Sequence, residues 1–131
     1  MRNLIGTWRL VKGESVFEDG TPGPAPYGGP GALGRVTLGE DGRMVAVLCD
    51  GRSDIPAGET REYTSYCGRW TFDGATLVTR VDACSDPARM GTDQVRRVEF
   101  EDGLMALHPP PRVRDGKQES RKLFWEKISD V

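Results

Sequence analysis

Three side chains in this sequence are suited to proton transfer and anion binding: Tyr66, Arg96 and His108. His108 is the single histidine of the chain, and because its ordinary pKa lies near neutrality it is the expected general base. Arg96 alternates with apolar residues, so we expect its guanidinium to point inward, with Tyr66 supplying a hydroxyl. An isomerisation or cyclisation needs little more than a dry cavity, one acid or base and one oxyanion partner. The three residues therefore predict cofactor-independent proton-transfer chemistry.

Each of these residues also has a plainer explanation. His108 comes directly before Pro109, at the end of an expected strand, where a solvated rim position would explain it equally well. A buried guanidinium at position 96 needs an anion or several hydrogen-bond acceptors, and a surface position for Arg96 is also open. A ligand carboxylate, enolate or phenolate would serve, and so would an internal aspartate or glutamate. The chain has no Ser-His-Asp order, G-x-S-x-G, phosphate loop or H-E-x-x-H, which argues against hydrolase and nucleotide chemistry.

An aromatic face is expected on the strand 63–72, where Tyr66, Trp70 and Phe72 alternate with polar residues. This face could form a wall for a flat apolar ligand, or it could simply pack in the core. The loop 21–32 alternates prolines and glycines and carries Tyr27, so we expect it to close over a ligand. The predicted ligand contacts are Tyr27, Met44, Tyr66, Trp70, Phe72, Thr79 and Arg96.

Short strands separated by glycine turns run through the whole chain. About eight are expected, which predicts an all-β fold and a small antiparallel up-and-down barrel with an internal cavity, although a β-sandwich has the same pattern. In the strand 43–49 both faces are apolar, so the pattern does not show which face points inward. The expected strands are 4–11, 35–38, 43–49, 63–72, 76–82, 92–100, 104–108 and 121–128.

Length and composition limit the classes of function. The 131 residues predict one domain, 1–131, with a self-sufficient core. The net charge of −2 comes from interspersed charges, which predicts neither a nucleic-acid partner nor a membrane partner. No apolar leader or membrane span is evident, so a cytoplasmic location is expected. The three cysteines are expected to be free thiols, and neither a metal nor a cofactor is predicted.

Six motifs occur in the order and spacing of one known family, and on them the chain resembles the bacterial lipocalin-like domain family. This resemblance implies a barrel with an internal cavity, whose closed end is sealed by Gly6 and Trp8, with Trp125 or a basic residue of the last strand nearby. The motifs are Leu4-Ile5-Gly6-Thr7-Trp8-Arg9-Leu10-Val11, Pro26-Tyr27-Gly28, Asp41-Gly42-Arg43-Met44, Tyr63-x-x-Tyr66-x-Gly68, Gly91-Thr92-Asp93-Gln94-Val95-Arg96 and Trp125-Glu126-Lys127.

The chain departs from the family pattern at two positions. Thr79 stands where members often have histidine, and Arg89 stands where they often have tryptophan, which implies a more basic cavity mouth. Similar small barrels bind ligands or act as cyclases and isomerases of natural products. We therefore expect a small hydrophobic or aromatic ligand, with an isomerase or cyclase of a polyketide-like or terpenoid-like intermediate as the alternative. An interaction module that forms a homodimer through the barrel wall or an exposed edge strand is a third hypothesis.

Overall fold

The computed structural model describes residues 3–131, and almost all of its regular structure is β-strand. Two short 3-10 helices, η1 (Pro26–Gly31) and η2 (Pro87–Arg89), interrupt the strands. The strands are β1 (Gly6–Phe17), β2 (Ala32–Leu38), β3 (Arg43–Asp50), β4 (Tyr63–Phe72), β5 (Thr76–Cys84), β6 (Asp93–Glu101), β7 (Leu104–His108), β8 (Arg112–Arg114) and β9 (Lys117–Ser129).

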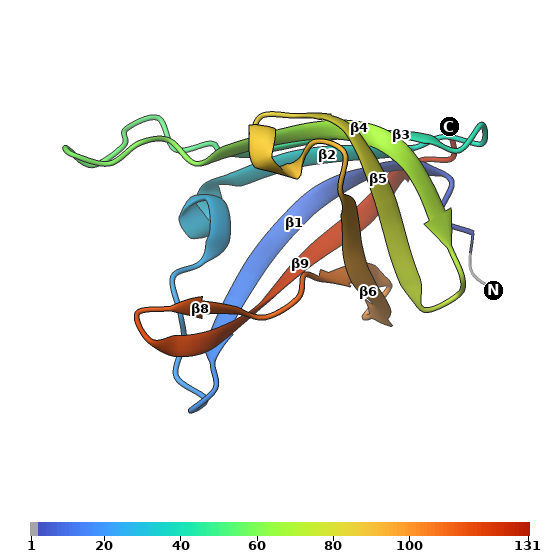
Figure 1. Cartoon of the computed structure of the whole chain (residues 1–131). Coiled ribbons are helices and arrows are strands. Elements are labelled where there is room, and N and C mark those ends of the chain that lie inside the picture. The colour runs from blue at the N-terminus through green and yellow to red at the C-terminus, as the bar shows by residue number, and fades with distance from the viewer. Residues whose placement is uncertain (1–2) are drawn as a thin grey trace.

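The strands close into an antiparallel barrel of eight, and β8 is an extra strand that pairs only with β9 (Figure 1). Neighbours in the sheet are consecutive from β1 to β7, β7 pairs with β9, and β9 returns to pair with β1 along most of its length. The β1–β9 pairing leaves a barrel without a free edge, which distinguishes it from a β-sandwich. The predicted up-and-down barrel is therefore confirmed.

The strand boundaries differ from the predicted ones mainly at the open end of the barrel. β1 continues to Phe17 instead of ending at Val11, with an irregularity in its register between Leu10 and Lys12. β8 was not predicted, because three residues after a run of prolines give no readable alternation. The hairpin between β8 and β9 turns at Asp115, whose φ of 52° is left-handed. Because β9 pairs with β8 directly after this turn, β9 begins at Lys117, earlier than the predicted residue 121.

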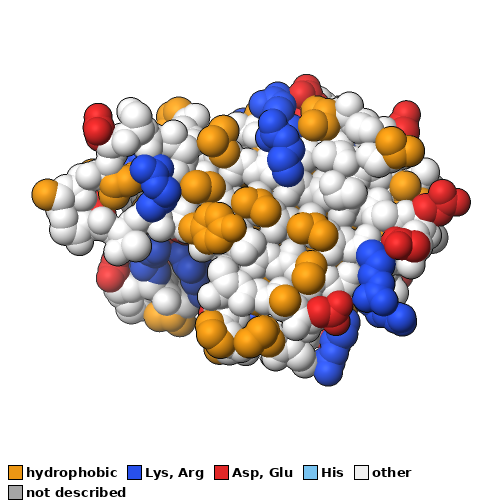
Figure 2. Space-filling model, turned by 90° about the horizontal axis from the view of Figure 1, so that it is seen from above, with side chains coloured by type: hydrophobic (Ala, Val, Ile, Leu, Met, Phe, Trp, Pro, Cys, Tyr) orange, Lys and Arg blue, Asp and Glu red, His pale blue; other side chains and the backbone are white. Residues whose placement is uncertain are grey.

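The inward face of β3 is decided by the barrel. Met44, Ala46 and Leu48 are buried inside, whereas Val45 and Val47 remain exposed on the outer wall. Figure 2 shows this wall from above, with apolar side chains gathered over it. Both faces of β3 are apolar, so only the curvature of the closed sheet distinguishes inside from outside.

The closed end of the barrel is organised around Trp8. Its side chain is buried, and its indole Nε1 donates a hydrogen bond to the Leu4 carbonyl oxygen at 3.0 Å. The Lys127 ammonium of β9 lies 5.6 Å from the indole ring, a favourable cation–π arrangement. Gly6 has a φ of 141°, and a Cβ there would lie 2.4 Å from the Ser129 carbonyl oxygen. A glycine is thus required where β1 and β9 approach each other most closely.

Two expectations from composition can be compared with the structure. Cys49, Cys67 and Cys84 are all free, as predicted. Within residues 3–131 no helix has the length and apolar character needed to cross a membrane.

Candidate ligand-binding cavity

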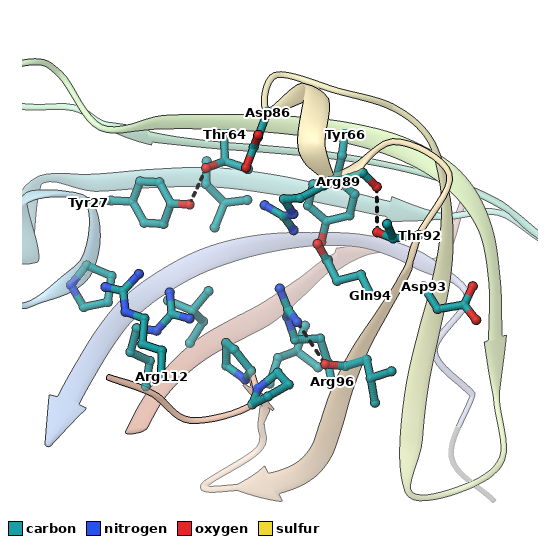
Figure 3. Close-up of a pocket in the computed structure, with 18 of the residues that line it drawn as sticks. Tyr27, Thr64, Tyr66, Asp86, Arg89, Thr92, Asp93, Gln94, Arg96 and Arg112 are labelled. Atoms are coloured by element: carbon teal, nitrogen blue, oxygen red, sulfur yellow. Dashed lines mark hydrogen bonds between the residues drawn. The ribbon is translucent and has the colours of Figure 1, made fainter. Parts of the chain in front are cut away.

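A cavity of about 510 Å³ opens at the end of the barrel where η1 and η2 lie (Figure 3). It lies between the inner faces of β4, β6 and β9, with η1 and η2 at its rim. Its apolar lining comes from Leu48, Leu107, Leu123 and Trp125, and its uncharged polar lining includes Tyr27, Thr64, Tyr66 and Gln94. The volume is typical of sites for small molecules, and polar and apolar surface contribute about equally to the lining.

Tyr66 points into the cavity from the middle of β4, as the alternation in the sequence predicts. Burial raises the pKa of its phenol, while the charge of Arg96 and a hydrogen bond with Gln94 act in the opposite direction. The Arg89 guanidinium lies 5.3 Å from the centre of the Tyr66 ring. The phenol therefore stays protonated at neutral pH and is a hydrogen-bond donor or an acid, not a base.

Arg96 also points inward, from β6, so that its guanidinium faces Tyr66 across the cavity (Figure 3). Its Nη1 donates to the Val95 carbonyl oxygen at 2.9 Å. The pKa of Arg96 is lowered to about 10, mainly by burial and also by repulsion from Arg89 and Arg121, while Tyr66 partly offsets these effects. No carboxylate within residues 3–131 forms an ion pair with it. The internal acidic partner considered from the sequence is therefore not found there.

A second group of charges lies where β8 and β9 meet the open end. Glu119 is completely buried, and it accepts hydrogen bonds from Ser15 Oγ at 2.5 Å and Arg112 Nε at 2.7 Å. Arg114 Nε lies 3.4 Å from the same carboxylate. Burial raises the pKa of Glu119, but these hydrogen bonds and positive charges together hold it below its ordinary value. Glu119 thus stays ionised and fixes Arg112 at the cavity wall.

Tyr27 closes one side of the cavity from η1. Its hydroxyl donates to Thr64 Oγ1 at 2.8 Å, and its backbone N–H donates to Glu62 Oε1 at 2.7 Å. Its φ of 53° lies in the left-handed region. The following residue, Gly28, passes so close to Asp50 that a Cβ would lie 2.4 Å from its Oδ1. Because η1 is held from both sides, Tyr27 is in place over the cavity before any ligand arrives.

Four of the predicted ligand contacts lie outside the lining of this cavity. Met44 and Thr79 are buried in the barrel, Trp70 donates its indole Nε1 to the Gly39 carbonyl oxygen at 3.0 Å, and Phe72 packs against the core. Residue 70 is four positions beyond Tyr66, which along a strand is about 13 Å toward the closed end. The aromatic face of β4 is therefore divided: Tyr66 lines the cavity, and the other rings fill the core.

His108 lies on the outer wall and does not meet Tyr66 and Arg96. Its neighbours in β7, Met105 and Leu107, belong to the core, so the alternation directs the His108 side chain outward. Burial lowers the pKa of His108, and the positive charge of nearby arginine and lysine side chains lowers it further. The expected trio of Tyr66, Arg96 and His108 is thus separated by the sheet, and only the first two share a cavity.

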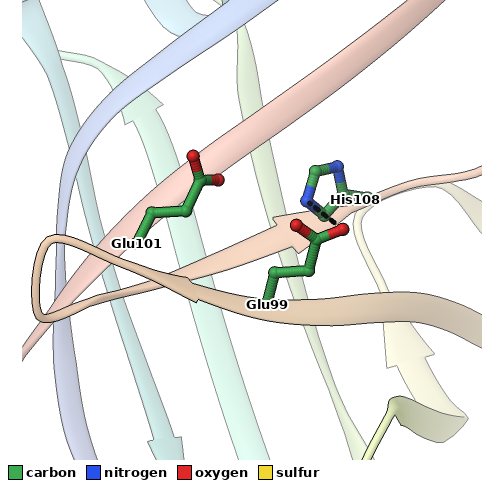
Figure 4. A group of neighbouring side chains, drawn as sticks. All are labelled: Glu99, Glu101 and His108. Carbon is green, nitrogen blue, oxygen red and sulfur yellow. Dashed lines mark ion pairs between the residues drawn. The ribbon is translucent and has the colours of Figure 1, made fainter.

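Two glutamates surround the imidazole on this wall (Figure 4). Glu99 Oε1 lies 3.8 Å from His108 Nε2, and Glu101 is close by. Both carboxylates already have cationic partners, since Glu99 pairs with Arg97 and Glu101 with Lys122. The cluster is best described as a charge network on the barrel surface.

Three further arginines line the cavity besides Arg96, and the sequence reading predicted none of them as a ligand contact. Arg89 was noted only as a source of a basic mouth, and Arg112 and Arg121 were not singled out. Arg121 could have been found, because it shares its strand face with Leu123 and Trp125. Trp125 belongs to the same core cluster as Trp8 and also lines the cavity.

Closed antiparallel barrels of eight strands with an internal cavity include proteins that hold a small molecule inside. The family model for the lipocalin-like domain matches residues 5–128. The chain therefore belongs to the lipocalin-like domain family. No curated protein matches the chain, and no solved structure matches it either.

Proposed function

We propose that this protein binds a small hydrophobic or aromatic metabolite in the cavity beside Tyr66. The observation that supports the proposal is the cavity itself, about 510 Å³ in volume. Leu123 and Trp125 offer apolar contact area there, while the protonated Tyr66 hydroxyl can orient an acceptor atom of the ligand. Tyr27 covers the ligand from η1. The family's fold also supports binding of a small molecule.

Tryptophan fluorescence provides a direct test. Trp125 is the one tryptophan among the cavity-lining residues that the structure describes, so a bound aromatic ligand should quench or shift its emission. In a metabolite screen, we expect at least one compound to change the emission and to raise the melting temperature. If no compound in a broad screen does either, the binding function is wrong.

The matched control is Trp125→Phe. This variant should lose the fluorescence change while still binding the ligand in isothermal titration calorimetry. Trp70→Phe serves as the opposite control, because Trp70 lies outside the cavity lining and its replacement should leave the fluorescence change intact.

Catalysis by the same cavity is a second candidate function, favoured by the juxtaposition of Tyr66 and Arg96. A neutral phenol can donate its proton to an oxygen of the substrate and then take a proton back from the group that forms the new bond, and a guanidinium can stabilise the negative charge that develops on that oxygen. These two roles suit an isomerase or cyclase of a polyketide-like or terpenoid-like intermediate.

Activity of this kind should depend on Tyr66 and Arg96 and not on His108. On a substrate that is turned over, we expect Tyr66→Phe and Arg96→Gln each to lower kcat by about 100-fold or more. His108→Ala should leave kcat within about twofold, because its side chain is on the outer wall. Turnover that survives the Tyr66 and Arg96 replacements, singly and together, would exclude this assignment.

The cytoplasmic location, the absence of nucleic-acid and membrane partners and the homodimer stay predictions from the sequence. Sedimentation of the purified chain would test the homodimer, and a purely monomeric protein would contradict it.

A further inference from the structure

The cavity contains more positive than negative charge, although the chain as a whole carries a net charge of −2. Two aspartates are also in the lining, but both are engaged elsewhere. The Asp86 carboxylate accepts a hydrogen bond from the Ala88 N–H at 3.0 Å, and the Asp93 carboxylate pairs with Arg80 at 3.4 Å. The lining arginines are Arg89, Arg96, Arg112 and Arg121.

Of these four arginines, Arg89, Arg96 and Arg121 form no ion pair within the described residues. The buried Nε of Arg121 has no hydrogen-bond partner within the described residues. Arg96 has a backbone carbonyl as its hydrogen-bond acceptor and no ion pair. Arg112 differs, because the buried Glu119 holds it. An unpaired guanidinium away from water is unfavourable, so an anion in the cavity would stabilise Arg96 and satisfy the free Nε of Arg121, on which Glu119 acts only as a nearby charge.

The unpaired guanidiniums are also close enough to act on one another. Burial lowers the pKa of Arg96, and so does repulsion by Arg89 and Arg121. The side chains of Arg89 and Arg96 both extend toward the middle of the cavity (Figure 3). An anion placed between these groups would relieve the repulsion and satisfy the free donors at the same time.

We propose that the ligand is an organic anion, with a flat apolar body and a carboxylate bound by Arg96 and Arg121. A carboxylate presents two oxygens in one plane and matches the planar donors of a guanidinium. The apolar body would rest on Leu123 and against the Tyr66 ring, which a small inorganic anion could not use. This inference rests on the proposed binding function and specifies the chemical class of the ligand.

The test compares aromatic carboxylic acids with their neutral primary amides, which have almost the same shape. Pairs with one, two and three rings are titrated into the protein by calorimetry at neutral pH. For the best-fitting pair, we expect the acid to bind at least about tenfold more tightly than its amide, as a charge-assisted hydrogen bond requires. In Arg96→Gln and in Arg121→Gln, this preference should fall to within about twofold.

Arg97→Gln is the matched control. Arg97 is the next residue along the same strand, but it lies exposed on the outer wall and pairs with Glu99, so its replacement should leave the preference for the acid unchanged. Circular dichroism verifies that each variant is folded, and having two cavity variants keeps the test valid if one of them does not fold.

The outcomes separate the two proposals. An amide that binds as tightly as its acid would overturn the anion inference and leave the binding function intact. A preference for the acid that persists in both cavity variants would overturn the assignment to Arg96 and Arg121. If neither member of any pair binds and the metabolite screen is also negative, the binding function itself is wrong.

Discussion

Replacing Trp8 by alanine is expected to lower the free energy of unfolding by about 3–5 kcal/mol. The indole is 4% exposed and fills the closed end of the barrel, its Nε1 bonds the Leu4 carbonyl, and the Lys127 ammonium lies over its ring. Alanine leaves a cavity in a region where Gly6 already brings β1 and β9 close together. The loss of packing should therefore also weaken the pairing between β1 and β9, which closes the barrel.

Urea unfolding followed by circular dichroism measures this effect. Trp8→Phe should lose less stability than Trp8→Ala, because an aromatic ring still fills most of the space, although the hydrogen bond to the Leu4 carbonyl is lost. Tyr63→Ala is the matched control, since Tyr63 is 53% exposed on the outer wall and its removal should change stability by no more than about 0.5 kcal/mol. A Trp8→Ala protein that kept its stability but lost ligand binding would contradict a sealing role for Trp8.

Replacing Glu119 by alanine is expected to cost about 3 kcal/mol at neutral pH. Glu119 is fully buried, and it is the carboxylate that compensates Arg112 and Arg114 near the open end. Without it, the Ser15 hydroxyl loses its acceptor and the cavity wall gains a further unpaired cation. Urea unfolding at pH 7 measures the loss. Glu126→Ala is the control, because its ion pair with Arg9 is exposed and should contribute no more than about 1 kcal/mol.

The same carboxylate predicts how stability depends on pH. Its pKa is lower in the folded protein than its ordinary value of 4.5. The stabilisation from ionised Glu119 is therefore complete above pH 4.5 and is lost as the pH falls through the lowered, folded pKa. Glu119→Gln lacks this contribution, so its stability should fall less than that of the wild type when the pH is reduced from 7 to 3.

Other carboxylates with lowered pKa values, such as Asp19 and Asp73, are present in both the wild type and Glu119→Gln. The difference between the two pH profiles therefore isolates position 119. Parallel profiles for the wild type and Glu119→Gln would show that Glu119 does not stabilise the fold by its charge.

These expectations divide the barrel into two functional halves. At the closed end, Trp8 and its neighbours fill the interior and contribute stability. At the open end, charged side chains occupy the interior, and Arg121 is left with an unpaired donor. Polar groups of this kind lower stability unless a ligand satisfies them, so we place function where the packing is least complete.

The sequence by itself determined the strands, most of the turns and the inward face of several strands. Glycine after aspartate marks tight turns because it adopts positive φ without strain, and the alternation in 63–72 and 93–100 directs Tyr66 and Arg96 inward. The predicted basic residue beside Trp8 has a counterpart in Lys127. The turns and the strand faces depend on residues that are close together in the sequence, whereas the basic residue beside Trp8 was implied by the family resemblance.

Only the tertiary structure decided how far along the barrel each inward residue lies and which side chains meet. An alternation with period two shows which face of the sheet a residue is on, but not its position along the barrel axis. Trp70 and Tyr66 were therefore predicted to contact the same ligand, although only Tyr66 lines the cavity. Where both faces are apolar, as in β3, the period assigns no face at all. Arg96 and Arg121 come from strands that are not adjacent in the sheet, and closure of the barrel brings their charges together.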